Sequence, residues 1–208
     1  MATITDIEQQ KRRETRVSVY LDGDFWTGMP ADLCALLNLT IGQEITDERR
    51  QEIEGEVGES AGLEAAMNLL SYRDRSESEM RGRLTDKGYG DGVVEAVIRR
   101  LLEYGYLNDE HFARQVVEGQ QMKGRGRRAA EMALRKAGVD GDEAREALDA
   151  AYPSENEDDV AYDWASRRRV DVNTPEGRQK LTRQLAGRGF SFDVAKQVIM
   201  RLRDETDE

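Results

Sequence analysis

The chain has 208 residues and a formal net charge of −11, with 38% hydrophobic and 35% charged residues. This length accommodates one or two domains with a hydrophobic core, and the acidic balance argues against a protein that coats bare nucleic acid by bulk attraction. A single cysteine (Cys34) and a single histidine (His111) exclude an internal disulfide and leave a zinc site without its usual ligands.

The first residues, MATITDIEQQKRRE, are polar and carry acids, which is not typical of a signal or transit peptide. No run of residues in the sequence approaches the roughly 18 apolar residues of a membrane span. We therefore expect a cytoplasmic protein with no membrane contact, and we expect residues 1–15 to form a flexible N-terminus.

A small module is predicted to follow over residues 16–55. The segment VSVYL at 17–21 alternates apolar residues with Ser and Tyr, and the Asp-Gly pair after it is a strong hairpin signal. Pro30 suits the start of a short apolar helix, and Thr46 can cap a second helix. We predict a β-hairpin-plus-helix module, and a Gly/Glu-rich linker at 56–62.

A helical pattern begins at residue 63 and repeats. Gly88, Gly138 and Gly189 lie about 50 residues apart, and each follows a leucine by four residues. Each glycine stands where a helix would end in a left-handed conformation, which glycine adopts without a Cβ penalty. Small or apolar residues recur at matched positions on both sides of the three glycines, which indicates three copies of one unit.

Helix start signals agree with this repeat. Ser76 and Glu79 form a capping box, and Thr174 with Pro175 supplies a cap and a proline at the first helical position. We predict a mainly α protein, with three tandem three-helix repeats in an elongated curved solenoid. The repeats are predicted at 63–104, 109–151 and 156–204, before an acidic tail at 205–208.

Basic residues gather in the segment MKGRGRRAAE at 122–131. The segment is not a nucleotide-binding loop, because it lacks the Gly-Lys-Ser/Thr ending and a preceding strand. It is typical of a flexible basic turn before a helix N-terminus, where N–H groups favour an anion; a solvated loop is the competing interpretation. Together with the arginine run at 167–169, the candidate binding residues, which would face a filament or DNA partner, are Lys123, Arg125, Arg127, Arg128, Arg135, Lys136, Arg167, Arg168 and Arg169.

Other residues give no sign of catalysis. Trp26 and Trp164 are predicted core residues, and the segment YGYL at 104–107 is predicted to pack at a boundary between units. His111 has no nucleophile near it in the sequence, and the carboxylates show no spacing that marks an acid/base pair. We therefore predict that the protein is not an enzyme and holds no metal or cofactor.

Several segments together resemble the RecX family of bacterial recombination regulators. They are SYRDRSESEMRGRLTDKGY at 71–89, VIRRLLEYGYLNDEHFARQVV at 97–117, GRGRRAAEMALRKAGV at 124–139 and LTRQLAGRGFSFDVAKQVI at 181–199. The segment VSVYLDGDFWTG resembles an extension of some members. The most specific motif comprises Gly105, Tyr106, Leu107, Asn108, Asp109, Phe112 and Ala113. Asn108 stands where an acid is usual, and it can still cap a helix.

The resemblance implies a non-enzymatic regulator of DNA recombination, DNA repair and the SOS response. Such proteins bind along the groove of the RecA–single-stranded DNA filament and inhibit ATP hydrolysis, strand exchange and coprotease activity. Our hypothesis is that the basic turn faces the DNA-lined groove. Two alternatives stay open, a helical adaptor for another protein and a DNA-binding regulator unrelated to the recombinase. No unit shows a heptad seam, so we expect a monomer.

Overall fold

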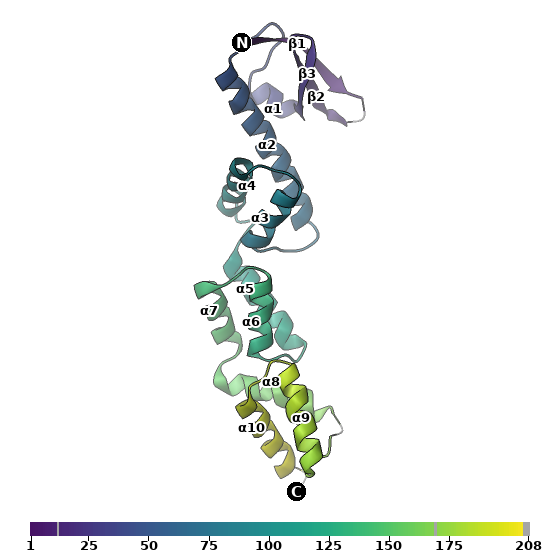
Figure 1. Ribbon diagram of the computed structural model, residues 1–208, viewed down its shortest axis with the longest axis vertical. Helices are drawn as coiled ribbons and strands as arrows, with labels where there is room; N and C mark the ends of the chain where they lie inside the picture. The colour runs from purple at the N-terminus through teal and green to yellow at the C-terminus, as the bar shows by residue number, and fades with distance from the viewer. Residues whose placement is uncertain (12, 169, 206–208) are drawn as a thin grey trace. The chain divides into compact units, whose positions relative to one another are not determined.

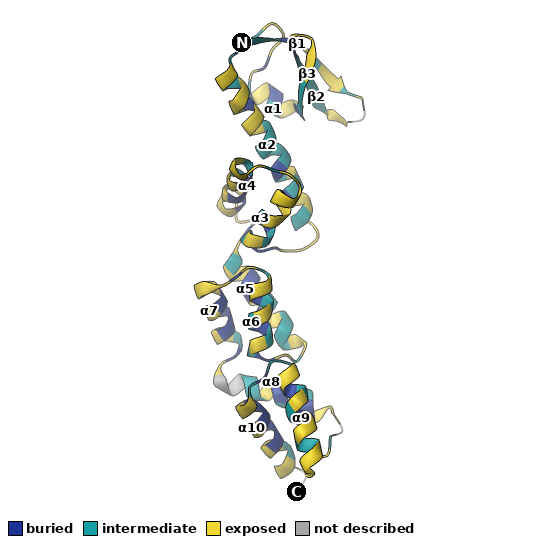
Figure 2. Cartoon of the chain, in the orientation of Figure 1, coloured by how far each residue is buried: buried dark blue, intermediate teal, exposed yellow. Residues whose placement is uncertain are grey.

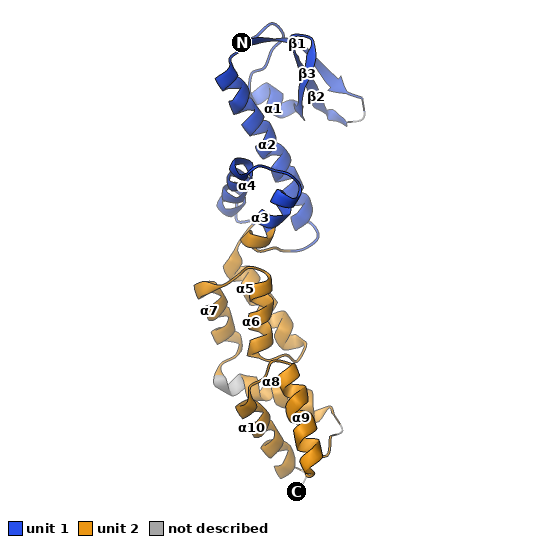
Figure 3. Cartoon of the chain, viewed as in Figure 1, with its two compact units in different colours: residues 1–73, 80–106 blue, residues 74–79, 107–208 orange. Residues whose placement is uncertain are grey.

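The structure is a computed structural model that describes the chain except for residues 12, 169 and 206–208. The described residues form four strands and ten helices (Figure 1). They divide into two compact units (Figure 3). Unit 1 comprises residues 1–73 and 80–106, and unit 2 comprises residues 74–79 and 107–208. Residues 206–208 of the predicted acidic tail lie outside the described residues.

Unit 1 begins with an antiparallel sheet in the order β3-β2-β1-β4. Its strands are β1 (Ala2–Gln10), β2 (Arg13–Leu21), β3 (Asp24–Pro30) and β4 (Glu44–Ile45). The prediction of a flexible N-terminus at 1–15 is therefore wrong. β1 pairs with β2 from Ile4 to Gln10, and Ile4 is fully buried. One face of the sheet meets water, so a paired strand in this position can be rich in polar residues.

The predicted hairpin is confirmed. Asp22 and Gly23 join β2 to β3 with φ values of 49° and 94°, which suit the tight turns of two-residue hairpins. Helix α1 (Ala31–Leu36) starts directly after Pro30, as expected. Trp26 differs from its prediction as a core residue: it is only partly buried, and its indole N–H donates to Glu54 Oε1 at 2.8 Å.

Helix α2 (Asp47–Leu70) runs without interruption through the predicted linker at 56–62, so that prediction is wrong. Its start is confirmed, because Thr46 Oγ1 accepts a hydrogen bond from the Arg49 N–H at 3.2 Å. Two of the glycines that suggested a linker are packing residues instead. A β-carbon at Gly58 or Gly62 would lie within 2.9 Å of a valine side chain of helix α4 (Asp91–Glu103). The two helices therefore approach closely there.

Helix α3 (Glu77–Asp86) begins with the predicted cap. Ser76 Oγ accepts a hydrogen bond from the Glu79 N–H at 3.0 Å and donates to the Ala137 carbonyl. The left-handed glycines are confirmed as well, with φ values of 89°, 73° and 88° at Gly88, Gly138 and Gly189. These signals are local, which explains why the sequence alone reveals them.

Unit 2 contains the second and third repeats. The second repeat comprises α5 (Asp109–Met122), α6 (Arg127–Lys136) and α7 (Gly141–Ala151), and the third comprises α8 (Ser154–Ser166), α9 (Pro175–Gly187) and α10 (Phe192–Asp204). Each repeat has its own hydrophobic core, and the buried residues follow the inner faces of the helices (Figure 2). The mainly α fold with three repeats is confirmed, and the elongated solenoid stays a prediction.

Within the part of the chain that the structure describes, no helix combines the length and the apolar character needed to cross a membrane.

Candidate nucleic-acid interface

The basic turn between α5 and α6 is anchored to the third repeat. The Gly126 N–H donates to the Arg188 carbonyl at 3.0 Å, and the Arg128 N–H donates to the Gly189 carbonyl at 3.2 Å. In the other direction, Arg188 Nη1 donates to the carbonyls of Lys123 at 3.0 Å and Gly124 at 3.1 Å. The turn is therefore held on both sides by hydrogen bonds, in contrast to the expected flexible loop.

Close packing explains the glycines of this turn. A β-carbon at Gly124 would lie 2.9 Å from Cδ1 of Trp164, and one at Gly126 would lie 2.6 Å from the ring of Phe190. Gly189 approaches from the other side, where a β-carbon would lie 2.5 Å from the Ala129 nitrogen. The α5–α6 and α9–α10 turns are so close here that their backbones are in contact. The glycines therefore allow this packing and form no phosphate-binding loop.

The N-terminus of α6 already has an anion from the same chain. The Arg127 N–H donates to Glu157 Oε1 at 3.0 Å, and a carboxylate at this end of a helix is stabilised by the helix dipole. The Glu157 carboxylate therefore occupies the position at the N-terminus of α6 where an anion from another molecule was expected. Anion binding by this region must depend on side chains.

Two arginines lie over the indole of Trp164, and the basic turn beside it carries Arg125 and Lys123. We call these four cations and the indole the Trp164 cluster. The guanidinium carbons of Arg168 and Arg188 lie 4.5 Å and 4.3 Å from the ring centroid, well within the range of cation–π attraction. Arg125 is close enough to repel the Arg188 charge, and Lys123 follows α5 on the same turn. The cluster joins cations from both repeats of unit 2.

The charges of the Trp164 cluster are not neutralised. None of its four cations forms an ion pair with a carboxylate among the described residues. Burial lowers the pKa of Arg188, and repulsion from Arg168 and Arg125 lowers it further. An incoming anion would relieve this repulsion, so the cluster suits phosphate groups.

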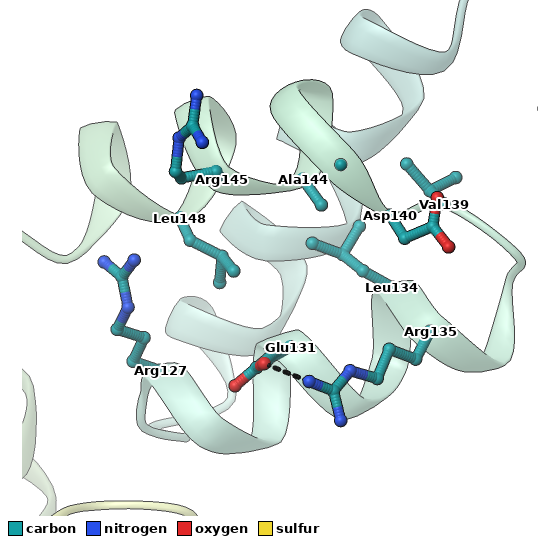
Figure 4. Close-up of a pocket in the computed structure, with 10 residues that line it drawn as sticks. Arg127, Glu131, Leu134, Arg135, Val139, Asp140, Ala144, Arg145 and Leu148 are labelled. Carbon is teal, nitrogen blue, oxygen red and sulfur yellow. Dashed lines mark hydrogen bonds and ion pairs between the residues drawn. The ribbon is translucent and has the colours of Figure 1, made fainter.

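Two other predicted residues, Arg127 and Arg135, line a groove of about 330 Å³ between α6 and α7. We call it the α6–α7 groove. Leu134, Ala144 and Leu148 lie between its arginines (Figure 4). Each arginine of the groove is paired with a carboxylate: Arg127 with Asp149 at 2.5 Å, Arg135 with Glu131 at 2.6 Å and Arg145 with Asp142 at 2.7 Å.

The remaining predicted residues lie apart from these two sites. Arg128 and Lys136 are exposed on α6, and Arg167 is exposed at the C-terminal end of α8. Arg169 lies outside the described residues. Of the nine predicted cations, the structure thus places Arg125 and Arg168 near Arg188, and Lys123 lies on the same turn as Arg125.

Sequence reasoning missed Arg188 and the part that Trp164 has in the site. Trp164 is partly buried against the core of the third repeat, and its ring also forms cation–π contacts with two guanidinium groups. Two signals were available. Arg168 follows Trp164 by four residues at the end of a predicted helix, close to the spacing of side chains that meet, and Arg188 directly precedes the repeat glycine Gly189.

Residues of the motif at 105–113 support the fold of unit 2. Asn108 caps α5 by accepting the His111 N–H at 2.8 Å, as expected. Asp109 accepts the Glu77 N–H at 2.8 Å, and its pKa is raised chiefly by burial. Leu107, Phe112 and Ala113 are buried, whereas Tyr104 and Tyr106 are 68% and 53% exposed. The packing predicted for residues 104–107 is therefore wrong for both tyrosines.

Comparison with known proteins identifies the family. The RecX N-terminal domain model matches residues 2–46, and the models of the first, second and third RecX three-helix domains match residues 63–101, 108–148 and 155–199. The chain is 31% identical to the regulatory protein RecX of Bacillus subtilis over 211 aligned residues, which cover 100% of this chain and 80% of that protein. The chain belongs to the RecX family.

Other RecX proteins support this assignment. The RecX protein of Clostridioides difficile is 28% identical, with 97% of this chain and 96% of that protein covered. A crystal structure of a regulatory protein RecX matches the fold with a TM-score of 0.72 at 24% identity, covering 95% of this chain and 98% of that one. These RecX relatives are named as regulatory proteins.

Proposed function

We propose that this protein binds the RecA filament formed on single-stranded DNA and inhibits its ATP hydrolysis, strand exchange and coprotease activity. It acts as a cytoplasmic monomer and catalyses no reaction itself. Membership of the RecX family supports the link to RecA. The observation that carries the proposal is the Trp164 cluster, whose four cations lack acidic partners among the described residues.

Two cations of the cluster are arranged before any DNA arrives. Arg188 is fixed by two backbone carbonyls, and Arg168 rests against the indole. Side chains that are already ordered lose little entropy on binding, so more of the interaction energy contributes to affinity. Guanidinium groups also match the geometry of phosphate oxygens. We assign the contacts with the DNA backbone to Arg168, Arg188, Arg125 and Lys123.

The overall charge favours a filament over bare DNA. A chain with a net charge of −11 is repelled by DNA except where cations are concentrated, which limits bulk attraction. A nucleoprotein filament offers protein surface beside each stretch of DNA, so acidic parts of this chain can face basic parts of the recombinase. Inhibitory binding through the Trp164 cluster then needs both components.

The decisive experiment measures DNA-dependent ATP hydrolysis by the cognate RecA on single-stranded DNA while this protein is added below stoichiometry. We expect inhibition by few molecules per many recombinase protomers. An unrelated ATPase that depends on single-stranded DNA serves as the control, because simple competition for DNA would inhibit both enzymes. No inhibition of RecA by the folded protein at low salt would contradict the proposal and favour an adaptor role.

A further inference from the structure

Unit 1 contains a second cationic groove, which the proposed function does not use. Two cavities, of about 400 Å³ and about 540 Å³, share Arg13, Arg16 and Glu64 in their walls. The first cavity is also lined by Tyr72 and Lys87. Because they share these walls, the cavities adjoin and form one groove, which we call the unit 1 groove.

The cations of the unit 1 groove differ in how firmly they are held. Arg16 is 17% exposed, and its guanidinium donates to the Gly28 carbonyl at 2.9 Å and lies 3.6 Å from the Glu64 carboxylate. Arg13 and Lys87 are exposed and have no ion-pair partner among the described residues. The groove therefore presents two unneutralised positive charges beside one fixed cation, with the Glu64 and Asp32 carboxylates at its wall.

Aromatic rings accompany these cations. Tyr72 is 85% exposed, so the chain covers little of its ring. Tyr89 also lines the groove, where its hydroxyl donates to the Ala61 carbonyl at 3.0 Å. An exposed ring flanked by Lys and Arg is the arrangement by which proteins bind single-stranded nucleic acid, because bases stack on the ring while cations hold phosphates.

The repeat pattern gives independent support. Lys87 directly precedes the left-handed Gly88, and Arg188 directly precedes the left-handed Gly189. The first and third repeats therefore place a cation at the same point of the fold, each beside an aromatic side chain. The second repeat has Ala137 there and no such pairing at that position.

We propose that the unit 1 groove binds single-stranded nucleic acid independently of the recombinase. Arg13 and Lys87 hold phosphates, Arg16 orders the wall between them, and a base stacks on Tyr72. Duplex DNA does not fit this role, since its bases are stacked within the helix. An acidic peptide would satisfy the cations and leave the exposed ring unused, so the observations favour a nucleic acid.

The test measures binding of a short fluorescent oligo(dT) to the full chain by anisotropy across a range of salt concentrations. The variant Arg13→Glu/Lys87→Glu is compared with Arg99→Glu/Lys196→Glu, which makes the same charge change at exposed positions outside both sites. We expect weaker binding and a salt slope that is smaller by about 1.4 for the groove variant alone, since each phosphate contact on a single strand contributes about 0.7.

A second pair of variants tests stacking. Tyr72→Ala should weaken binding roughly five- to 150-fold, as expected from the loss of one stacked base, whereas Tyr72→Phe should bind like the natural chain. Equal losses in the two charge-reversal variants, or no effect of Tyr72→Ala, would overturn the proposal. Displacement of the oligonucleotide by poly-glutamate as effectively as by unlabelled oligo(dT) would overturn it in favour of an acidic protein segment. These binding experiments contain no recombinase. A negative result would therefore contradict the unit 1 groove as a binding site without contradicting the proposed inhibition of RecA.

Discussion

The Trp164 cluster and the α6–α7 groove are both built from arginines of unit 2, yet their charges differ in effect. Every arginine of the α6–α7 groove is paired with a carboxylate, so much of its field is cancelled at a distance. No cation of the Trp164 cluster has such a pair among the described residues. A count of Lys and Arg in a stretch of sequence therefore says little about anion binding.

Position along the helices explains the difference. Arg135 and Arg145 lie within α6 and α7, where a residue three or four positions away supplies the acid. Lys123 and Arg188 cap the C-terminal ends of α5 and α9, and Arg168 follows the end of α8. Cations there are stabilised by helix dipoles. Three helix ends thus bring unpaired cations together.

The largest effect is expected from reversing charge in the cluster. Arg125→Glu/Arg168→Glu should raise the concentration needed for half-inhibition of RecA ATPase at least roughly a hundredfold, because hydrogen bonds to charged groups contribute about 1.5–3 kcal/mol each. Arg135→Glu/Arg145→Glu makes the same charge change in the α6–α7 groove and should retain inhibition. Similar losses in both variants would show that the two regions do not differ in function.

The next effect concerns the turn that assembles the cluster. Gly189→Ala should lower the free energy of unfolding by about 2–5 kcal/mol, since it adds a close contact to the cost of a left-handed conformation. Gly187→Ala is the control, because a β-carbon there meets open space. Urea unfolding of both variants measures the difference. Equal stability would mean that the two turns do not pack as described.

Tyr152 gives a pH-dependent test of the same turn. Its hydroxyl donates to the Arg125 carbonyl at 2.9 Å, and burial, followed by the Glu157 charge, raises its pKa to about 12. The stability that Tyr152 contributes is therefore complete below pH 10 and is lost as the pH rises toward 12, by on the order of 2 kcal/mol. Tyr152→Phe should flatten this part of the profile. An unchanged profile would contradict the buried hydroxyl.

The smallest effect is expected in the α6–α7 groove. Arg135→Ala breaks an exposed ion pair between residues four apart, which costs about 0.3–0.5 kcal/mol at low salt and less at high salt. Thermal unfolding at two salt concentrations measures this cost. A loss of several kcal/mol, or a loss of RecA inhibition, would mean that the groove contributes more than solvated surface charge.

Local signals of the sequence predict much of this fold. The caps at Thr46, Ser76 and Thr174 and the left-handed glycines depend on a few neighbouring residues, so they are readable directly. The strand at 2–10 and the continuous helix at 47–70 depend on partners elsewhere in the chain. The strand at 2–10 was missed because its residues are largely polar. The linker was predicted wrongly because Gly58 and Gly62, which pack against α4, are also typical of linkers.

The candidate site is less predictable for a related reason. The sequence shows that residues 123–128 are basic, and it cannot show which cations acquire acidic partners on folding. Arg188 lies 65 residues after Lys123 and 64 residues after Gly124, whose carbonyls it contacts. No local pattern connects it to Lys123 and Gly124.

The contact between the α5–α6 and α9–α10 turns is made largely by the main chain and by glycines. Exposed cations such as Lys123, Arg125 and Arg168 surround this contact without forming it. Substitution at those positions can therefore change affinity for DNA without breaking the contact between the two turns. A side chain larger than hydrogen at the glycines would clash with the facing turn. Natural selection can thus tune the strength of regulation and the integrity of the scaffold separately.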